Sequence, residues 1–228
     1  MARSPGMLVV LVSASLLMLG AGTNAHAQGE HQRRFAVELR LIAGDLRRLG
    51  QEQATQEHTA GLQQRLRGSL SYLGLLGREA VQERSQPDPQ LAADVNRLRD
   101  AYDAGKQSAM HAPLARLLQR YPLSVTDFSA DRQQDAQRLA VGRDIDRSLC
   151  FGCHQNPNPE AANPAPDLFA DARSMTREEF VARLMGGVRG VPATGLDNPL
   201  SDEDLRGLYA WYRNGPQAES KDGKIVAR

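Results

Sequence analysis

Hydrophobic residues between Glu30 and Tyr121 recur at steps of three and four, the spacing that places side chains on one face of an α-helix. Short breaks separate the stripes at Pro87-Asp88-Pro89 and at Pro113, and the fourth helix is expected to follow Pro113. We predict a helical bundle over residues 28–125, stabilised by mutual burial of the stripes, because no single helix of this kind is stable alone in water. The four stripes are Phe35, Leu39, Ile42, Leu46 and Leu49; Leu62, Leu66, Leu70, Leu73, Leu76 and Ala80; Leu91, Val95, Leu98 and Tyr102; and Leu114, Leu117, Leu118 and Tyr121.

A second helical pattern covers residues 131–215, so the predicted fold class is all-α throughout. Its first helix is expected to carry an apolar face, a later one to begin with a capping box at Thr176 to Glu179 and end at Gly186-Gly187, and the last to begin with Ser201 as N-cap. The two outer helices carry the faces Leu139, Gly142, Ile145 and Leu149, and Leu205, Leu208, Tyr209 and Tyr212. A polar tail, residues 216–228, is expected to be loose.

The first 27 residues have the order of a secretory signal peptide. Arg3 precedes an apolar run from Met7 to Leu19, and small residues follow up to Ala25-His26-Ala27. The run is short for a membrane span, so we predict cleavage after Ala27 and no span in the mature chain.

The balance of charged residues narrows the classes of partner that the chain could bind. Of 228 residues, 28 are Lys or Arg and 27 are Asp or Glu, and the predicted cleavage removes Arg3 alone and leaves the mature charge balanced. Such a chain has no global charge to attract nucleic acid or an anionic membrane, so any docking patch is local.

The run Cys150-Phe151-Gly152-Cys153-His154 contains both cysteines of the chain. C-x-x-C-H is the pattern of a c-type haem attachment site, in which two thiols join the porphyrin and the histidine binds the iron. The alternatives are a dithiol redox pair, half of a zinc site or a simple disulfide, and the sequence offers no second ligand pair for zinc. We therefore predict one haem c, attached through Cys150 and Cys153, with His154 as the proximal iron ligand.

Residues 131–215 resemble a class I cytochrome c. The resemblance rests on Gly142 ahead of the cysteine motif, on Pro166-Asp167-Leu168 after it, and on the sequence that opens an aromatic final helix. It implies that the first and last helices cross at Gly142 against Tyr209 or Tyr212. It also implies that the Pro166 carbonyl accepts a hydrogen bond from His154 and that Leu168 packs on the haem.

The family's methionine ligand is missing. Class I cytochromes place a Met-Pro pair before the last helix, whereas this chain has Gly190-Val191-Pro192. Met185 is the first candidate for a distal ligand and Met175 the second. An open sixth coordination position on the iron is an alternative of equal weight to Met185. Arg173, Arg183 and Arg189 are weaker candidates for contact with the propionates.

These observations predict a periplasmic monohaem cytochrome that carries single electrons between periplasmic redox proteins. The alternative is a haem-based ligand-binding or sensor protein with an open or non-methionine sixth position. An enzyme is the less favoured class, because no acid–base pair suited to peroxidase chemistry stands out. The sequence does not fix the oligomeric state or the role of the N-terminal helices.

Overall fold

The computed structural model describes residues 28–50, 56–129, 136–155, 165–187 and 198–215. Within these ranges every regular element is helical, which confirms the all-α prediction. The predicted signal peptide, the Gly190-Val191-Pro192 segment, Arg189 and the tail lie outside the described residues. The elements are α1 (Glu30–Leu49), α2 (Gln56–Arg84), α3 (Leu91–Asp103), α4 (Gln107–Arg120), α5 (Ala136–Ile145), a π-helical turn (Asp146–Cys150), α6 (Phe151–His154), α7 (Leu168–Ser174), α8 (Arg177–Gly186) and α9 (Asp202–Asn214).

Helices α1 to α4 form the predicted N-terminal bundle. The four stripes meet in one apolar core in which Phe35, Leu73 and Leu98 are fully buried. The prediction placed the fourth helix after Pro113, but α4 begins at Gln107 and contains Pro113 on its buried face. The helix thus tolerates a residue without a backbone N–H, and the neighbouring Met110 and Leu114 pack into the core.

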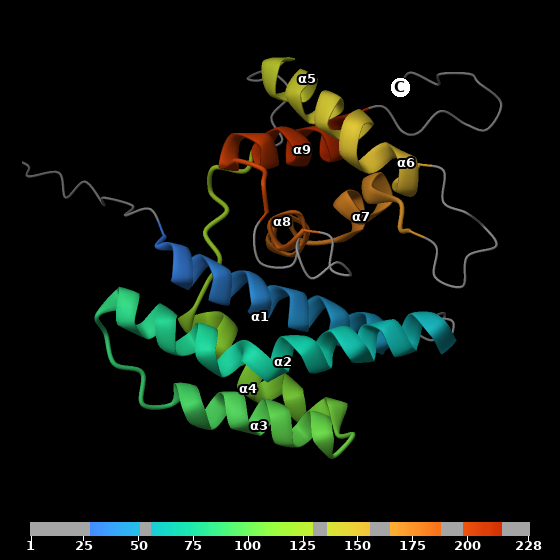
Figure 1. Ribbon diagram of the computed structural model, residues 1–228. Coiled ribbons are helices and arrows are strands. Elements are labelled where there is room, and N and C mark those ends of the chain that lie inside the picture. The colour runs from blue at the N-terminus through green and yellow to red at the C-terminus, as the bar shows by residue number, and fades with distance from the viewer. Residues whose placement is uncertain (1–27, 51–55, 130–135, 156–164, 188–197, 216–228) are drawn as a thin grey trace, which may run out of the picture.

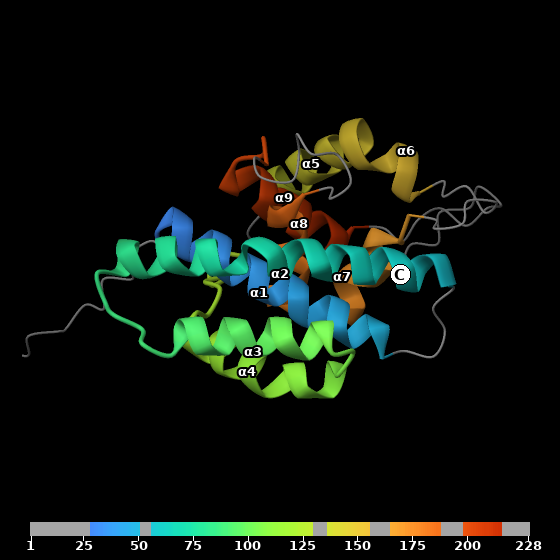
Figure 2. The same ribbon diagram turned by 60° about the horizontal axis from the view of Figure 1, so that its bottom comes forward.

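Helix α1 lies between two cores. Figures 1 and 2 show it with α2, α3 and α4 on one side and the group α5 to α9 on the other. While its predicted stripe faces the bundle, Ala36, Val37 and Leu41 enter a second core with residues of α7, α8 and α9. Leu123 and Val125, in the segment after α4, join the same second core. The N-terminal and C-terminal parts of the chain therefore share a helix as well as a connection.

Helices α5 and α9 cross in direct backbone contact. A Cβ atom on Gly142 would lie 2.1 Å from the carbonyl oxygen of Gly207 and 2.8 Å from Cβ of Trp211. The resemblance implied Tyr209 or Tyr212 at this crossing, and that detail is wrong. The absence of a side chain at both glycines brings the helices so close that backbone, not an aromatic ring, fills the contact. Tyr212 packs instead against the rings of Phe169 and Phe180.

The predicted helix ends are largely confirmed. Ser201 and Asp204 form a reciprocal capping box at the start of α9. Thr176 caps α8 by accepting from the Glu179 N–H, but the Glu179 carboxylate does not complete a box, because it binds arginines of α1 and α8. Helix α8 ends at Gly186, and Gly187 follows with φ of 62°, a conformation that suits glycine. No helix in the described part of the chain is long and apolar enough to span a membrane.

Candidate functional site

The C-x-x-C-H motif occupies one turn at the end of a nearly continuous helix. Cys150 closes the π-helical turn, and Cys153 and His154 belong to α6. Cys150 is half-buried, Cys153 is exposed, and no disulfide joins them. His154 is half-buried on the same turn. The two thiols and the imidazole are therefore presented together by one short segment.

The imidazole of His154 is held by the backbone of Pro166. Its Nδ1 lies 2.7 Å from the Pro166 carbonyl oxygen. A carbonyl oxygen can only accept, so Nδ1 carries the hydrogen and Nε2 keeps a lone pair free for a metal. This is the contact that the resemblance implied.

Helix α7 fixes the position of the Pro166 carbonyl. Asp167 caps the helix by accepting from the N–H groups of Phe169 and Ala170, at 2.8 and 3.1 Å. Leu168, the first residue of α7, packs partly buried against the second core. Pro166 itself is exposed, but the two residues that follow it are held by a helix cap and an apolar contact.

A buried carboxylate lies beneath the cysteine turn. Asp146 is 1% exposed and accepts hydrogen bonds from the Tyr212 hydroxyl at 2.6 Å, from Trp211 Nε1 at 3.1 Å and from Gln155 Nε2 at 3.3 Å. The same Tyr212 hydroxyl lies near the Cys150 thiol. Burial raises the pKa of the Cys150 thiol, and the contact with Tyr212 opposes that rise. Burial and the bond to Asp146 raise the pKa of Tyr212, so the hydroxyl stays a neutral donor.

Sequence reasoning missed Asp146 and misplaced Leu149. The predicted apolar face ran from Leu139 through Ile145 to Leu149, yet Leu149 is 65% exposed. Leu149 lies within the π-helical turn, whose wider winding rotates its residues away from an α-helical register. A signal for a buried Asp146 was available in the sequence. An acidic residue directly follows an apolar position of the stripe, and the last helix carries two aromatic residues that can donate hydrogen bonds.

The two candidate methionines lie in different surroundings. Met175 follows α7 and is buried in the second core. Met185, near the end of α8, lines a cavity of about 450 Å³ together with residues of α1 and α2, among them Val37 and Leu76. The residues lining this cavity include none from the C-x-x-C-H turn. The structure therefore does not bring Met185 and His154 together in one described cavity.

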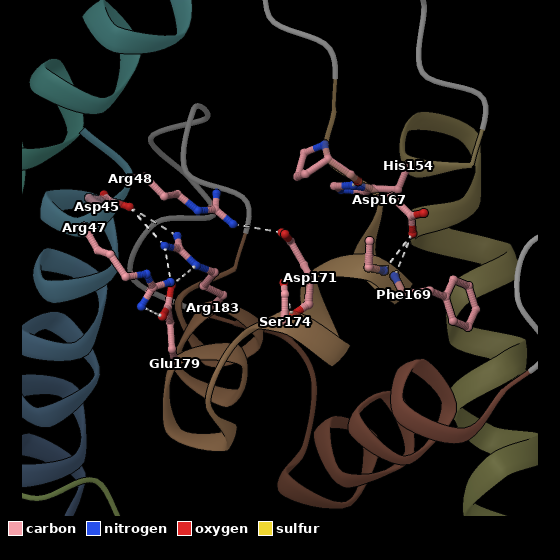
Figure 3. Close-up of polar contacts among 12 residues, drawn as sticks. Asp45, Arg47, Arg48, His154, Asp167, Phe169, Asp171, Ser174, Glu179 and Arg183 are labelled. Carbon is pink, nitrogen blue, oxygen red and sulfur yellow. Dashed lines mark hydrogen bonds and ion pairs between the residues drawn. The ribbon is translucent and has the colours of Figure 1, made fainter. Parts of the chain in front are cut away.

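An ionic cluster joins α1 to the helices behind the motif. Asp45, 1% exposed, is bound by Arg65 of α2 at 2.6 Å and by Arg183 of α8 at 3.2 Å. Glu179 of α8 contacts Arg183 at 2.9 Å and Arg47 at 2.5 Å. Figure 3 shows Asp45 and Arg47 of α1 facing Glu179 and Arg183 of α8.

The same face of α1 also reaches α7. Arg48 pairs with Asp171 of α7 at 3.0 Å, so the helix that follows Pro166 is tied to the N-terminal bundle (Figure 3). Arg183, weighed above as a propionate contact, is engaged at this interface. Arg47 and Arg183 together lower the pKa of Glu179. Burial, the largest single influence, acts in the opposite direction.

The donor set fits a haem c. Two thiols on one turn, a histidine with its Nδ1 satisfied and its Nε2 available, and an adjacent apolar residue at Leu168 are the groups that such a cofactor requires. Among the described residues, no cluster of three or more His, Cys, Asp and Glu side chains is arranged to hold a metal ion.

Comparison with known proteins gives one family. Residues 137–211 match the family described as cytochrome C oxidase, cbb3-type, subunit III. Searches of curated proteins and of solved structures gave no match. The matched segment spans α5 to most of α9 and leaves α1 to α4 outside it. The C-terminal part of this chain is thus a cytochrome c domain of the cbb3 subunit III type, preceded by helices that belong to no family found.

Proposed function

We propose that this chain is a periplasmic monohaem cytochrome that carries single electrons between redox proteins. The observation that carries the proposal is the contact between His154 Nδ1 and the Pro166 carbonyl, within a cytochrome c domain that has one C-x-x-C-H motif. A free dithiol or a disulfide would not require the histidine to be oriented in this way. The sequence has two cysteines, so one covalent haem is the full complement.

Each residue of the site has a distinct role in this proposal. Cys150 and Cys153 hold the porphyrin through thioether bonds, and His154 supplies Nε2 to the iron. The Pro166 carbonyl keeps the imidazole in one tautomer and orientation and makes it a stronger donor. Leu168 supplies apolar contact. When bound, the haem supplies a one-electron couple, and no bond to a substrate is made or broken, so we assign no catalytic residue.

The location and the partners follow from the sequence. The order of charged, apolar and small residues before Gln28 is that of an exported chain, and covalent haem attachment takes place outside the bacterial cytoplasm. The partners are other periplasmic redox proteins, which meet the cytochrome c domain at the exposed side of the cysteine turn, where Phe151 and Cys153 are exposed.

The decisive experiment is expression together with a cytochrome c maturation system. The purified wild-type protein should gain the mass of one haem, resist extraction of the haem by acidified solvent and show a one-electron reduction by optical titration. The Cys150→Ser, Cys153→Ser double variant is the control and should stay colourless. A colourless wild-type protein with two free thiols would overturn the proposal.

The open-site alternative is favoured by the positions of the methionines. Met175 is enclosed in the second core, and Met185 lines a cavity against the N-terminal helices. Met185→Ala and Met175→Ala test the two candidates separately. Loss of the long-wavelength sulfur-to-iron absorption in one variant would identify the ligand. Binding of CO by the reduced wild-type protein, with unchanged spectra in both variants, would instead support a ligand-binding haem.

A further inference from the structure

Asp146 is a buried carboxylate bound by neutral donors. Its two oxygens accept from the hydroxyl of Tyr212, the indole N–H of Trp211 and the side-chain amide of Gln155. At 1% exposure it has almost no contact with solvent. A charge removed from water in this way is costly unless it is compensated.

Three other buried carboxylates in the described part of the chain, Asp45, Asp94 and Glu179, are compensated by arginine. Asp45 is bound by Arg65 and Arg183, and Glu179 by Arg47 and Arg183. In the bundle, Asp94 contacts three arginines and its pKa falls to about 2. Among the residues that the structure describes, Asp146 has no such ion pair. Its hydrogen bonds are satisfied while its charge is not neutralised.

The residues that donate hydrogen bonds to Asp146 lie beside both ends of the C-x-x-C-H segment. At one end, the Tyr212 hydroxyl donates to the Asp146 carboxylate and lies near the Cys150 sulfur. At the other end, Gln155, which donates to Asp146, follows His154 directly. The Tyr212 hydroxyl thus lies near both the carboxylate and a sulfur that would hold the porphyrin.

We propose that Asp146 is a positioning residue that sets the reduction potential of the attached haem through its uncompensated charge. The inference rests on the proposed function, because it requires a haem on Cys150 and Cys153. Oxidised haem iron carries one more positive charge than reduced iron, so a nearby negative charge stabilises the oxidised form. Poor screening inside the protein makes this effect larger than that of an equal charge at the surface.

The test compares two aspartates two residues apart. Asp146→Asn keeps the shape of the side chain and removes the buried charge, whereas Asp144→Asn removes an equal charge from a side chain that is 66% exposed. Potentials are measured by optical redox titration of the haem-loaded proteins. We expect Asp146→Asn to shift the equilibrium about tenfold toward the reduced form, which is about 59 mV for a one-electron couple. Asp144→Asn should shift it less than about twofold, because its charge is screened by water and paired with Arg143 at 3.1 Å.

Tyr212→Phe separates the charge from the mechanical role of the network. This variant keeps the carboxylate but removes its shortest hydrogen bond, so at alkaline pH, which favours the ionised form, the potential should stay at the wild-type value or fall. A structural role alone would lower the unfolding temperature in both Asp146→Asn and Tyr212→Phe without opposite effects on the potential. If Asp146→Asn does not accumulate, Tyr212→Phe still decides, since a potential that stays raised at alkaline pH in that variant contradicts the proposal.

Two failures are distinguishable. A wild-type protein without haem refutes the proposed function. A wild-type protein with haem, whose potential moves no more in Asp146→Asn than in Asp144→Asn, refutes the role of Asp146 and leaves the proposed function standing.

Discussion

Replacing Gly142 by alanine adds one methyl group at the point where α5 crosses α9. An ideal Cβ at this position would lie 2.1 Å from the carbonyl oxygen of Gly207 and 2.4 Å from its carbonyl carbon, where ordinary contact begins at 3.4 Å. The obstructing atoms are backbone, so the side chain cannot rotate out of the way. The two helices must separate by about 1 Å or bend.

The expected loss of stability combines three effects. Overpacking of a close contact costs about 1–3 kcal/mol. Separation also strains the bonds from Trp211 and Tyr212 to Asp146, one turn further along, and a weakened buried hydrogen bond adds about 1 kcal/mol. Alanine's better helix propensity returns about 1 kcal/mol. We expect a net loss of about 1–3 kcal/mol, or about 2–12 °C in Tm for a chain of this size.

Gly68→Ala is the matched control. Gly68 lies within α2, and a Cβ there would meet no atom within 4 Å. The same substitution should therefore stabilise the protein by about 0.5–1 kcal/mol, through helix propensity alone. Thermal unfolding followed by circular dichroism measures both variants without haem. A Gly142→Ala protein as stable as the wild type would refute the reading of the α5–α9 crossing as a backbone contact.

Three further predictions concern the charges and the shared helix. Asp94 has a folded-state pKa of about 2, below its ordinary 3.8, so its ion pairs stabilise the protein fully above about pH 4 and less as the pH falls toward 2; unfolding measured against pH should show this loss, and Asp94→Asn should abolish it. Gly44→Ala places a methyl group 2.4 Å from Glu179 Oε1 and 2.6 Å from Arg183 Nη2, and because these side-chain ends can shift we expect a loss of only about 1 kcal/mol in urea unfolding; a loss as large as that of Gly142→Ala would contradict this. A segment containing residues 131–228 alone should bind a hydrophobic dye and unfold without a cooperative transition, because it lacks the α1 side chains of the second core; cooperative unfolding of this segment would show that α1 is dispensable for it.

Periodicity was sufficient for the helices of the bundle and insufficient for the second face of α1. Phe35, Leu39, Ile42 and Leu46 stand at helical spacing and predict one buried stripe, which the structure confirms. The opposite face is buried through Ala36, Val37 and Leu41, which are interspersed with charged residues and so form no clear second stripe in the sequence. Asp45 is buried because arginines from α2 and α8 reach it, and those partners are 20 and 138 residues away in the sequence.

The candidate site was predictable where its chemistry depends on adjacent residues. Cys150, Cys153 and His154 form one motif, and Pro166 was found through a short family pattern. Asp146 was missed because its environment depends on a π-helical turn and on the last helix, neither of which a repeat of 3.6 residues represents. A distal ligand remains a prediction, since the Gly190-Val191-Pro192 segment lies outside the described residues.

The double burial of α1 has a consequence for biosynthesis. Translation produces α1 first, and its bundle partners α2 to α4 emerge before any residue of α5 to α9. The N-terminal half can therefore assemble while Val37 and Leu41 still face outward, as a preformed template on which the later helices close. Substitutions at these two positions would then reduce the yield of mature cytochrome by slowing that closure, although neither residue belongs to the cytochrome c domain.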